Sequence, residues 1–240
     1  MNGRAVSVAT RASLLYSCRL AELQDQEMND HFKIEAFPPL FERSSRDEVW
    51  EQQTRKQAEF LKKFKGGTLL VGDSLAKFWP KTLQQERFGR SFINLGVPGD
   101  RVENILWRLD AHNIKDLAPD RIIVIAGTNN LKTDVKPETI LCRLLALIET
   151  LKASVPEAPL FVSEIPPRGD EMKYRSEDII FLNRFLGEIS SEGGFKLVQI
   201  HASIMNIYNA CPENFDLYID KLHFGEKGYE LFSDALQEVI

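Results

Sequence analysis

Residues 68–75 read TLLVGDSL, a short β-branched and apolar run that meets Gly, Asp and Ser at its end. Runs of the same kind recur at 91–95, 121–126, 160–164 and 196–200. Helical patterns separate them, at about 100–117, 137–154, 177–191 and 225–239. Short buried strands that alternate with helices indicate a parallel sheet covered on both faces. Because the crossovers are right-handed, the pattern predicts one three-layer α/β domain over residues 66–240.

Residues 1–65 differ from this pattern and are predicted to form an N-terminal extension. Glu, Gln, Lys and Arg dominate residues 47–65, and the apolar residues among them recur roughly in helical phase. This stretch predicts an amphipathic helix that ends at Gly66 and Gly67. The rest of the extension is expected to be partly disordered. The 240 residues would allow one or two domains, and we expect one domain plus this extension.

The charge and cysteine content exclude several classes of protein. Thirty Lys and Arg against 35 Asp and Glu give a net charge of −5, which argues against nucleic acid as a partner. Three scattered cysteines show no ligand spacing, so neither a disulfide framework nor a zinc site is expected. The Gly-rich nucleotide-binding and Walker A patterns are both missing, and no apolar run is long enough to predict a membrane span.

The first 21 residues contain Arg4, Arg11 and Arg19 but no acidic residue. This bias is typical of an organelle transit peptide, and also of a frayed terminus. Reduced thiols suit a cytosol-like compartment. The expected location is therefore cytoplasmic, with import directed by residues 1–21 as the alternative.

Polar clusters follow the first three predicted strands and precede the last helix. They are residues 72–75 (GDSL), 94–100 (NLGVPGD), 127–130 (GTNN) and 220–223 (DKLH). Ligands of open parallel sheets bind outside the carboxyl ends of the strands. We therefore expect these four clusters to converge on one edge of the sheet.

Ser74 has the position of a nucleophile, because a strand-to-helix turn lifts a hydroxyl above the sheet. A serine hydroxyl needs a base, and His223 is the best candidate of the four histidines. Asp220 lies three residues earlier, so its carboxylate can orient the imidazole. An Asp-x-x-His pair is frequent by chance, so its interpretation as catalytic depends on Ser74 and the other clusters.

Ester hydrolysis also needs donors for the oxyanion that forms. Gly99 allows a backbone N–H to approach a substrate closely, Asn129 offers a side-chain amide, and the N–H of Ser74 is a third donor. Taken singly, these residues also fit ordinary turn chemistry after a strand. A Gly-x-Ser-x-Gly elbow is absent, since Ala76 stands where its second Gly would be, which disfavours the standard α/β-hydrolase fold. Phe78 and Trp79 are expected to be core residues.

The four ordered blocks resemble those of the GDSL/SGNH hydrolase superfamily. Within it, the chain is most similar to the catalytic subunits of intracellular platelet-activating-factor acetylhydrolase. Residues 106–109 (LWRL) and 166–169 (PPRG) support this likeness, which covers about residues 66–240. The resemblance implies a flavodoxin-like sheet of five parallel strands, in the order 2-1-3-4-5.

The same resemblance implies a role for each block. Ser74 would be the nucleophile, His223 the base and Asp220 the third triad member. The oxyanion hole would comprise the Ser74 and Gly99 N–H groups and the Asn129 side chain. No metal or other cofactor would be needed. One departure is Val97-Pro98, which replaces a more Gly-rich stretch and leaves open the geometry leading into Gly99.

The resemblance also bears on the substrate. Leu75, Thr128 and Leu222 occupy positions that keep the acyl pocket small in the acetylhydrolases, so a short acyl group is expected, acetyl above all. The expected substrate is thus a small-molecule ester, either a lipid or an acetylated sugar. Whether the chain forms a homodimer is left open. Two alternatives remain, a lysophospholipase or thioesterase acting on longer chains, and a non-catalytic binding module on the same fold.

Overall fold

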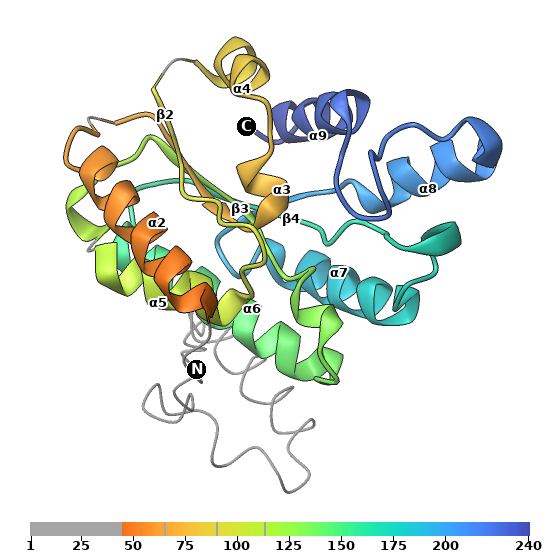
Figure 1. The fold of residues 1–240 in the computed structure, drawn as a ribbon, viewed down its shortest axis with the longest axis horizontal. Coiled ribbons are helices and arrows are strands. Elements are labelled where there is room, and N and C mark those ends of the chain that lie inside the picture. The colour runs from red at the N-terminus through yellow and green to blue at the C-terminus, as the bar shows by residue number, and fades with distance from the viewer. Residues whose placement is uncertain (1–44, 65, 90, 113) are drawn as a thin grey trace, which may run out of the picture.

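The structure is a computed structural model that describes residues 45–64, 66–89, 91–112 and 114–240. Its centre is a five-stranded parallel sheet in the order β2-β1-β3-β4-β5, which confirms the predicted order (Figure 1). The strands are β1 (Thr68–Gly72), β2 (Phe92–Asn94), β3 (Arg121–Ile125), β4 (Leu160–Ser163) and β5 (Lys196–Val198).

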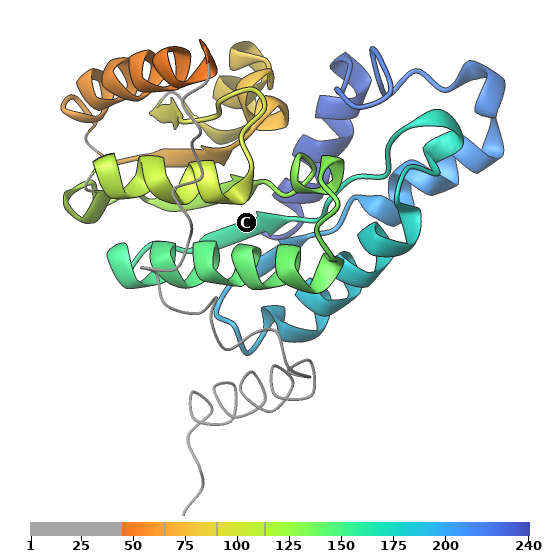
Figure 2. The same cartoon turned by 60° about the horizontal axis from the view of Figure 1, so that its bottom comes forward.

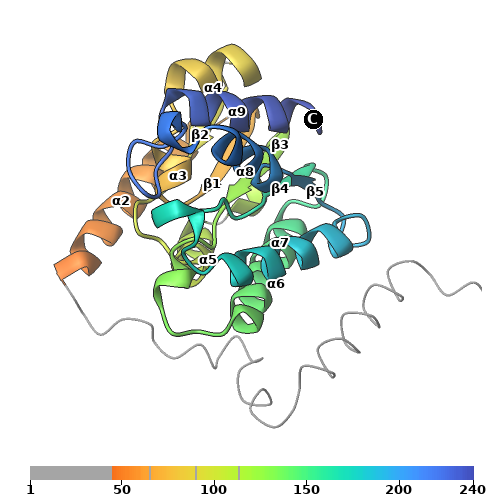
Figure 3. The same ribbon diagram turned by 90° about the vertical axis from the view of Figure 1, so that its right-hand side faces the viewer.

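Helices cover both faces of this sheet, as predicted. One face carries α2 (Ser45–Leu61), α5 (Val102–His112), α6 (Pro137–Ser154) and α7 (Ser176–Ser190), which lie side by side in Figure 2. The other face carries α3 (Ser74–Lys77), α4 (Lys81–Phe88), α8 (His201–Ala210) and α9 (Glu226–Gln237), seen above the sheet in Figure 3. Short 3-10 turns lie at Ile114–Asp116, Asn130–Lys132, Asp170–Met172 and Pro212–Asn214.

The alternation of side chains along the central strands builds two separate cores. On β1, Leu69 and Val71 face the α5–α6–α7 layer, whereas Leu70 faces the layer that contains α9. Leu69 pairs with Ile122 of β3 and Leu70 with Ile123, so the neighbouring strand repeats the alternation in register. Both faces of the central strands are thus buried, which explains why they read as nearly continuous apolar runs.

Three helices of the far layer were not predicted, namely α3, α4 and α8. The first has four residues and the second eight, too few to show helical periodicity. The predicted helix at 100–117 is α5 followed by the 3-10 turn, and the one at 47–65 is α2, which ends earlier, at Leu61. α2 packs against α5. The predictions for residues 1–44 concern residues that lie outside the described part of the chain.

The parallel strands bring the predicted clusters to one edge. Residues 72–75 follow β1, residues 94–100 follow β2 and residues 127–130 follow β3. Within the described ranges, no helix is long and apolar enough to cross a membrane.

Candidate active site

A chain of hydrogen bonds joins a serine, a histidine and an aspartate at this edge of the sheet. Nε2 of His223 lies 3.0 Å from Oγ of Ser74, and Nδ1 of His223 lies 2.8 Å from Oδ2 of Asp220. Ser74 is the first residue of α3, and the other two residues lie in the segment before α9. Such a chain can serve as a hydroxyl nucleophile, a base and a carboxylate that orients the base.

Asp220 is held by its own loop as well as by the imidazole. Its Oδ1 accepts hydrogen bonds from the backbone N–H groups of Leu222, at 2.6 Å, and His223, at 2.7 Å. Partial burial opposes ionisation, but these donors and the His223 ring outweigh it and lower the pKa of Asp220 to about 2. The carboxylate is therefore charged at any pH near neutrality, although about half of its side chain is exposed.

The loop that carries His223 is closed by backbone pairing. Ile219 donates its N–H to the carbonyl of His223 at 2.9 Å, and Tyr218 forms an antiparallel bridge with Phe224. Phe78 lies edge-on to the His223 ring, with 5.4 Å between the ring centroids. The prediction that Phe78 is a core residue is wrong, since half of its surface is exposed beside the triad, whereas Trp79 is buried as expected.

The turn between β1 and α3 aims Ser74 at His223. A Cβ at Gly72 would lie 2.2 Å from the carbonyl of Ile125, so only glycine lets β1 and β3 approach here. Oδ1 of Asp73 accepts a hydrogen bond from the N–H of Leu75 at 2.9 Å and caps α3. Complete burial raises the pKa of Asp73 to about 7, against smaller effects such as the Leu75 hydrogen bond, which lowers it.

Two backbone N–H groups and one side-chain amide were predicted to bind an oxyanion. Among the described residues, neither the N–H of Ser74 nor that of Gly99 donates to any oxygen. Gly99 has φ +84°, and a Cβ there would meet no atom within 4 Å. Nδ2 of Asn129 donates to the carbonyl of Asp100 at 2.9 Å, which places its amide against the Gly99 loop. Donors of this kind are what an oxyanion hole needs.

The two asparagines of residues 127–130 have different partners. Asn130 is fully buried; its Oδ1 accepts from the N–H of Val102 at 3.0 Å, and its Nδ2 donates to Glu103 at 2.7 Å. It therefore satisfies an otherwise unpaired N–H at the start of α5 from another loop. Asp100 lies just before α5, but among the described residues no hydrogen bond joins its side chain to the N-terminus of this helix.

Asp100 instead anchors the loop that bears Gly99. Its Oδ2 accepts from Nε and Nη2 of Arg108 at 2.8 and 2.5 Å, and both side chains are at most 1% exposed. Nη1 of Arg108 also donates to the carbonyl of Leu95 at 2.8 Å and to Gln57 of α2 at 3.0 Å. Residues 106–109 had contributed to the family resemblance, but no spacing rule pointed to this ion pair. Arg108 thus ties α5, the loop that bears Gly99 and α2 together.

The three residues predicted to limit the acyl pocket lie in different surroundings. Leu75 is buried in the core under α9, with its carbonyl bonded to the hydroxyl of Tyr229 at 3.0 Å. Thr128 is also buried, and its hydroxyl and carbonyl both accept from Arg168 at 2.9 Å. Leu222 lines an open hollow beside the triad, whereas the other two are not among the residues that line it.

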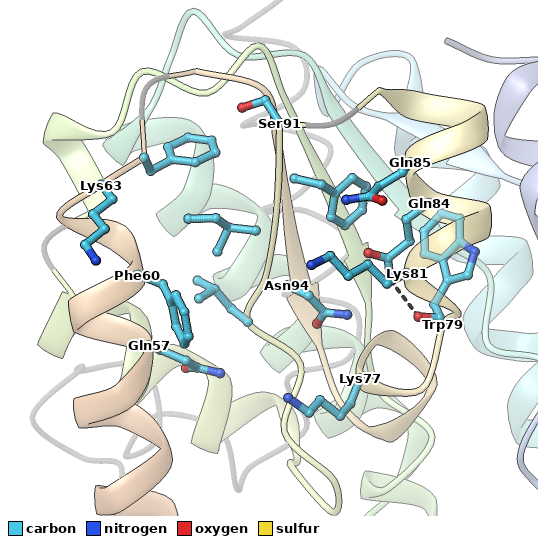
Figure 4. Close-up of a pocket in the computed structure, with 14 residues that line it drawn as sticks. Gln57, Phe60, Lys63, Lys77, Trp79, Lys81, Gln84, Gln85, Ser91 and Asn94 are labelled. Atoms are coloured by element: carbon cyan, nitrogen blue, oxygen red, sulfur yellow. Dashed lines mark hydrogen bonds between the residues drawn. The ribbon is translucent and has the colours of Figure 1, made fainter.

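Two hollows flank α3. The first, of about 540 Å³, is lined by His223 and Asp220 together with the loop after β4. The second, of about 520 Å³, lies across the open edge of β2 between α2 and α4, and Figure 4 shows Lys77 and Lys81 reaching into it. No triad residue lines the second hollow, so the first one is the candidate substrate site. Within the described residues, no group of three His, Cys, Asp or Glu side chains is arranged to hold a metal ion.

This sheet, with a serine turn after its first strand and an Asp-x-x-His segment before its last helix, defines the class of serine-type ester hydrolases. The chain belongs to the GDSL-like Lipase/Acylhydrolase family, whose model matches residues 66–231. It is therefore a carboxylic ester hydrolase, as the resemblance implied.

Relatives agree with this family, and solved structures share the fold. Platelet-activating factor acetylhydrolase IB subunit alpha2 of Homo sapiens is 25% identical over 221 residues, covering 85% of this chain and 89% of that protein. The Rattus norvegicus protein is 25% identical over 214 residues with the same coverage. A candidate platelet activating factor from Streptococcus pneumonia shares the fold, with a TM-score of 0.67 and 24% identity over 80% of this chain and 92% of the other. An acetyl-xylooligosaccharide esterase from Geobacillus Stearmophilus has a TM-score of 0.57 and 18% identity, over 73% and 94% of the chains.

Proposed function

We propose that this hydrolase removes short acyl groups, acetyl above all, from a lipid or carbohydrate ester through an acyl-enzyme on Ser74. The observation that carries the proposal is the 3.0 Å contact between Nε2 of His223 and Oγ of Ser74. Within that distance a neutral imidazole can take the hydroxyl proton as the oxygen attacks. The relatives named acetylhydrolases and the acetyl esterase neighbour favour acetyl as the acyl group.

The first half of the reaction forms the acyl-enzyme. Oγ of Ser74 attacks the carbonyl carbon while Nε2 of His223 takes its proton, and the carbonyl oxygen becomes an oxyanion. The N–H groups of Ser74 and Gly99 and the Asn129 amide would bind this oxyanion, and such donors each contribute about 10²–10³-fold in rate. The imidazolium, stabilised by Asp220, then gives the proton to the alcohol oxygen, and the ester C–O bond breaks.

The second half regenerates the serine. A water molecule gives a proton to His223 and attacks the acyl carbon, and the resulting tetrahedral intermediate expels Oγ, which recovers the proton from the imidazolium. The product is the free carboxylic acid. Side chains of this chain carry every proton, so the cycle needs no cofactor.

Esters of increasing acyl length test the proposal. We expect kcat/KM to fall from p-nitrophenyl acetate to butyrate to octanoate for the wild-type protein. The Ser74→Ala protein should lose about 10⁴-fold or more in kcat. Ser190→Ala is the matched control, because that hydroxyl bonds within α7, to the carbonyl of Gly187, and it should retain full activity.

Each alternative function has its own outcome in this experiment. Faster turnover of octanoate than of acetate would favour the longer-chain lysophospholipase or thioesterase. Equal rates for wild-type and Ser74→Ala would favour a non-catalytic binding module and contradict the proposal.

The organisation of the chain is part of the proposal. We place one catalytic domain at residues 66–240, with residues 1–65 as an extension whose helix α2 packs against it. A homodimer, a cytoplasmic location and organelle import by residues 1–21 all stay predictions. Cys142 and Cys211 are free thiols, which suits a reducing compartment.

A further inference from the structure

Arg168 is a buried cation beside the triad that the mechanism above does not use. It follows β4, and only 7% of its surface is exposed. Within the described residues, no carboxylate lies within ion-pair distance of its guanidinium. Arg108 differs in this respect, because its guanidinium is also buried but is neutralised by Asp100. A buried charge is costly unless it is paired, so an unpaired one next to an active site calls for a partner.

The contacts of Arg168 leave one edge of its guanidinium unused. Nη1 donates to the carbonyl and to the hydroxyl of Thr128, both at 2.9 Å. The cation also lies over the ring of Tyr174, 4.9 Å from the centroid. Nε is buried without a hydrogen-bond partner among the described residues, and Nη2 donates to none of them either. Nε and Nη2 together form the edge that binds a carboxylate or phosphate through two parallel hydrogen bonds.

The loop around Arg168 belongs to the hollow beside the triad. Arg168 lines this hollow together with Leu222 and His223, and Gly169 donates its N–H to the carbonyl of Lys221 at 2.8 Å. Burial lowers the pKa of the Arg168 guanidinium, as expected for a cation that water solvates poorly.

The other charges of the hollow already have partners. Asp220 is bonded to His223, and Lys221 forms an ion pair with Asp170 at 2.5 Å. Asp73 and Asp220 act to raise the pKa of Arg168, but neither carboxylate lies within ion-pair distance of its guanidinium. Lys221 keeps further N–H donors, but 70% of its side chain is exposed and water solvates its charge. Arg168 is thus the buried cation of this hollow that keeps hydrogen-bonding capacity for a ligand.

The position of the hollow indicates which part of a substrate it takes. In the proposed reaction, His223 gives its proton to the departing alcohol oxygen, so the alcohol portion must lie on the His223 side. The hollow lined by His223, Asp220 and Arg168 is on that side. An anion bound there would be part of the alcohol and not of the acyl group.

We propose that Arg168 binds an anionic group, a phosphate or a carboxylate, on the alcohol portion of the ester that this enzyme cleaves. The inference rests on the proposed function and sharpens it, because it selects anionic esters over neutral sugar esters. Arg168 then acts as a specificity-determining residue, and its hydrogen bonds to Thr128 hold it in the orientation for binding.

Three alkyl acetates with similar leaving groups test this inference. They are 3-acetoxypropyl phosphate, 4-acetoxybutanoate and the neutral methyl 4-acetoxybutanoate, each followed by acid release. For the wild-type enzyme we expect kcat/KM at least tenfold higher for one or both anionic esters than for the neutral ester. The preference between the two anions separates phosphate from carboxylate recognition.

Variants assign that preference to Arg168. Arg168→Met should lose at least tenfold in kcat/KM on the preferred anionic ester and less than threefold on the neutral ester. Arg168→Lys keeps the charge without the paired donors and should fall between the two. Lys173→Met is the matched control, because this exposed cation of the same loop pairs with Glu171 outside the hollow, and it should behave as wild type. An equal loss on all three esters, or no loss, would overturn the proposal.

A binding measurement separates this inference from the proposed function. Ser74→Ala should bind 3-hydroxypropyl phosphate or 4-hydroxybutanoate, measured by calorimetry, at least tenfold more tightly than neutral 1,3-propanediol. The double variant Ser74→Ala/Arg168→Met should lose that difference. Binding that persists while the wild-type protein cleaves no ester would sink the proposed function alone. Turnover without selective binding would sink the role of Arg168 alone. The comparison of the three ligands in the single variant decides the case even where the double variant does not fold.

Discussion

Nε2 of His223 lies 3.0 Å from Oγ of Ser74, although 149 positions of the chain separate the two residues. The contact depends on two local structures that face each other across the sheet edge. The Gly72–Asp73 turn presents the hydroxyl, and the bridge between Tyr218 and Phe224 presents the imidazole. Backbone and capping hydrogen bonds hold both segments, which favours a serine–histidine contact formed before a substrate arrives.

The role of Asp220 in orienting His223 gives the first prediction. Asp220→Asn keeps an oxygen for the two backbone donors but sets an amide against Nδ1, which favours the wrong tautomer. We expect kcat for p-nitrophenyl acetate to fall about 10³-fold, less than the ~10⁴-fold found for a fully buried triad carboxylate, because Asp220 is half exposed. Asp216→Asn is the control, as this residue pairs with Lys227 away from the triad. A kcat within tenfold of wild type would contradict the assigned role.

The pH dependence of the rate follows from the charges of the triad. On acidification kcat/KM should fall, because a protonated imidazole can take no proton from Ser74. Asp220 contributes nothing to this fall, since its pKa of about 2 keeps it ionised throughout the range. Rates measured from pH 8 to pH 5 test the point, and an unchanged rate over that range would contradict it. Asp73→Asn should show the same fall, which would exclude the titration of Asp73 as its cause.

The neighbouring asparagines of residues 127–130 should respond in opposite ways. Asn129→Ala removes an oxyanion donor, so kcat should drop about 10²–10³-fold while KM stays within about threefold. Asn130→Ala leaves the N–H of Val102 and the Glu103 carboxylate without their buried partner, so it should destabilise the fold by about 1–3 kcal/mol. Steady-state kinetics and denaturant unfolding of both variants check the contrast. A wild-type kcat for Asn129→Ala would exclude it from the oxyanion hole.

Much of this architecture follows from the sequence because the relevant signals are local. The apolar runs of β1 and β3 are buried on both faces, and the polar residues that follow each run necessarily lie at one edge of a parallel sheet. Ser74, Gly99 and Asn129 could therefore be brought together from their order alone. Asp220 and His223 could be paired from their spacing, because two side chains three positions apart in a turn can reach each other for a hydrogen bond.

The features that the sequence did not reveal depend on contacts between distant segments. The ion pair of Asp100 with Arg108 joins a loop to the middle of α5, and the bond of Arg168 to Thr128 joins two loops 40 residues apart. Neither has a characteristic spacing. α4 is short and mostly polar, so its packing against α9, and not its own pattern, makes it a helix.

Gly99 and Gly89 offer a matched pair for testing the oxyanion loop. Both have positive φ, +84° and +90°, and a Cβ at either would meet no atom within 4 Å. Replacement by Ala should therefore cost about 1–2 kcal/mol of stability at both sites, through backbone conformation alone. Only Gly99→Ala should lower kcat, by about 10–100-fold, because the strained backbone turns its N–H away from the oxyanion. Equal kcat values in the two variants would contradict the assignment of the Gly99 N–H as a donor.

The buried carboxyl of Asp73 should make stability depend on pH. Its pKa is raised from 3.8 to about 7 by burial, so the folded protein binds a proton that the unfolded chain releases in that interval. The stabilisation is complete below about pH 4 and is lost as the pH rises through about 7, at a slope of at most about 1.4 kcal/mol per pH unit. Asp73→Asn can keep the hydrogen bond from Leu75 but cannot titrate. Its stability relative to wild type should therefore rise between pH 5 and pH 7 and stay level above about pH 8.

Urea unfolding at several pH values measures this difference. Asp110→Asn is the control, because this exposed residue of α5 is solvated in the folded and unfolded states alike, and its variant should follow the wild-type pH dependence. A constant stability difference between Asp73→Asn and wild type from pH 5 to pH 8 would mean that Asp73 does not take up a proton there. The carboxyl of Asp73 would then already be charged at pH 5.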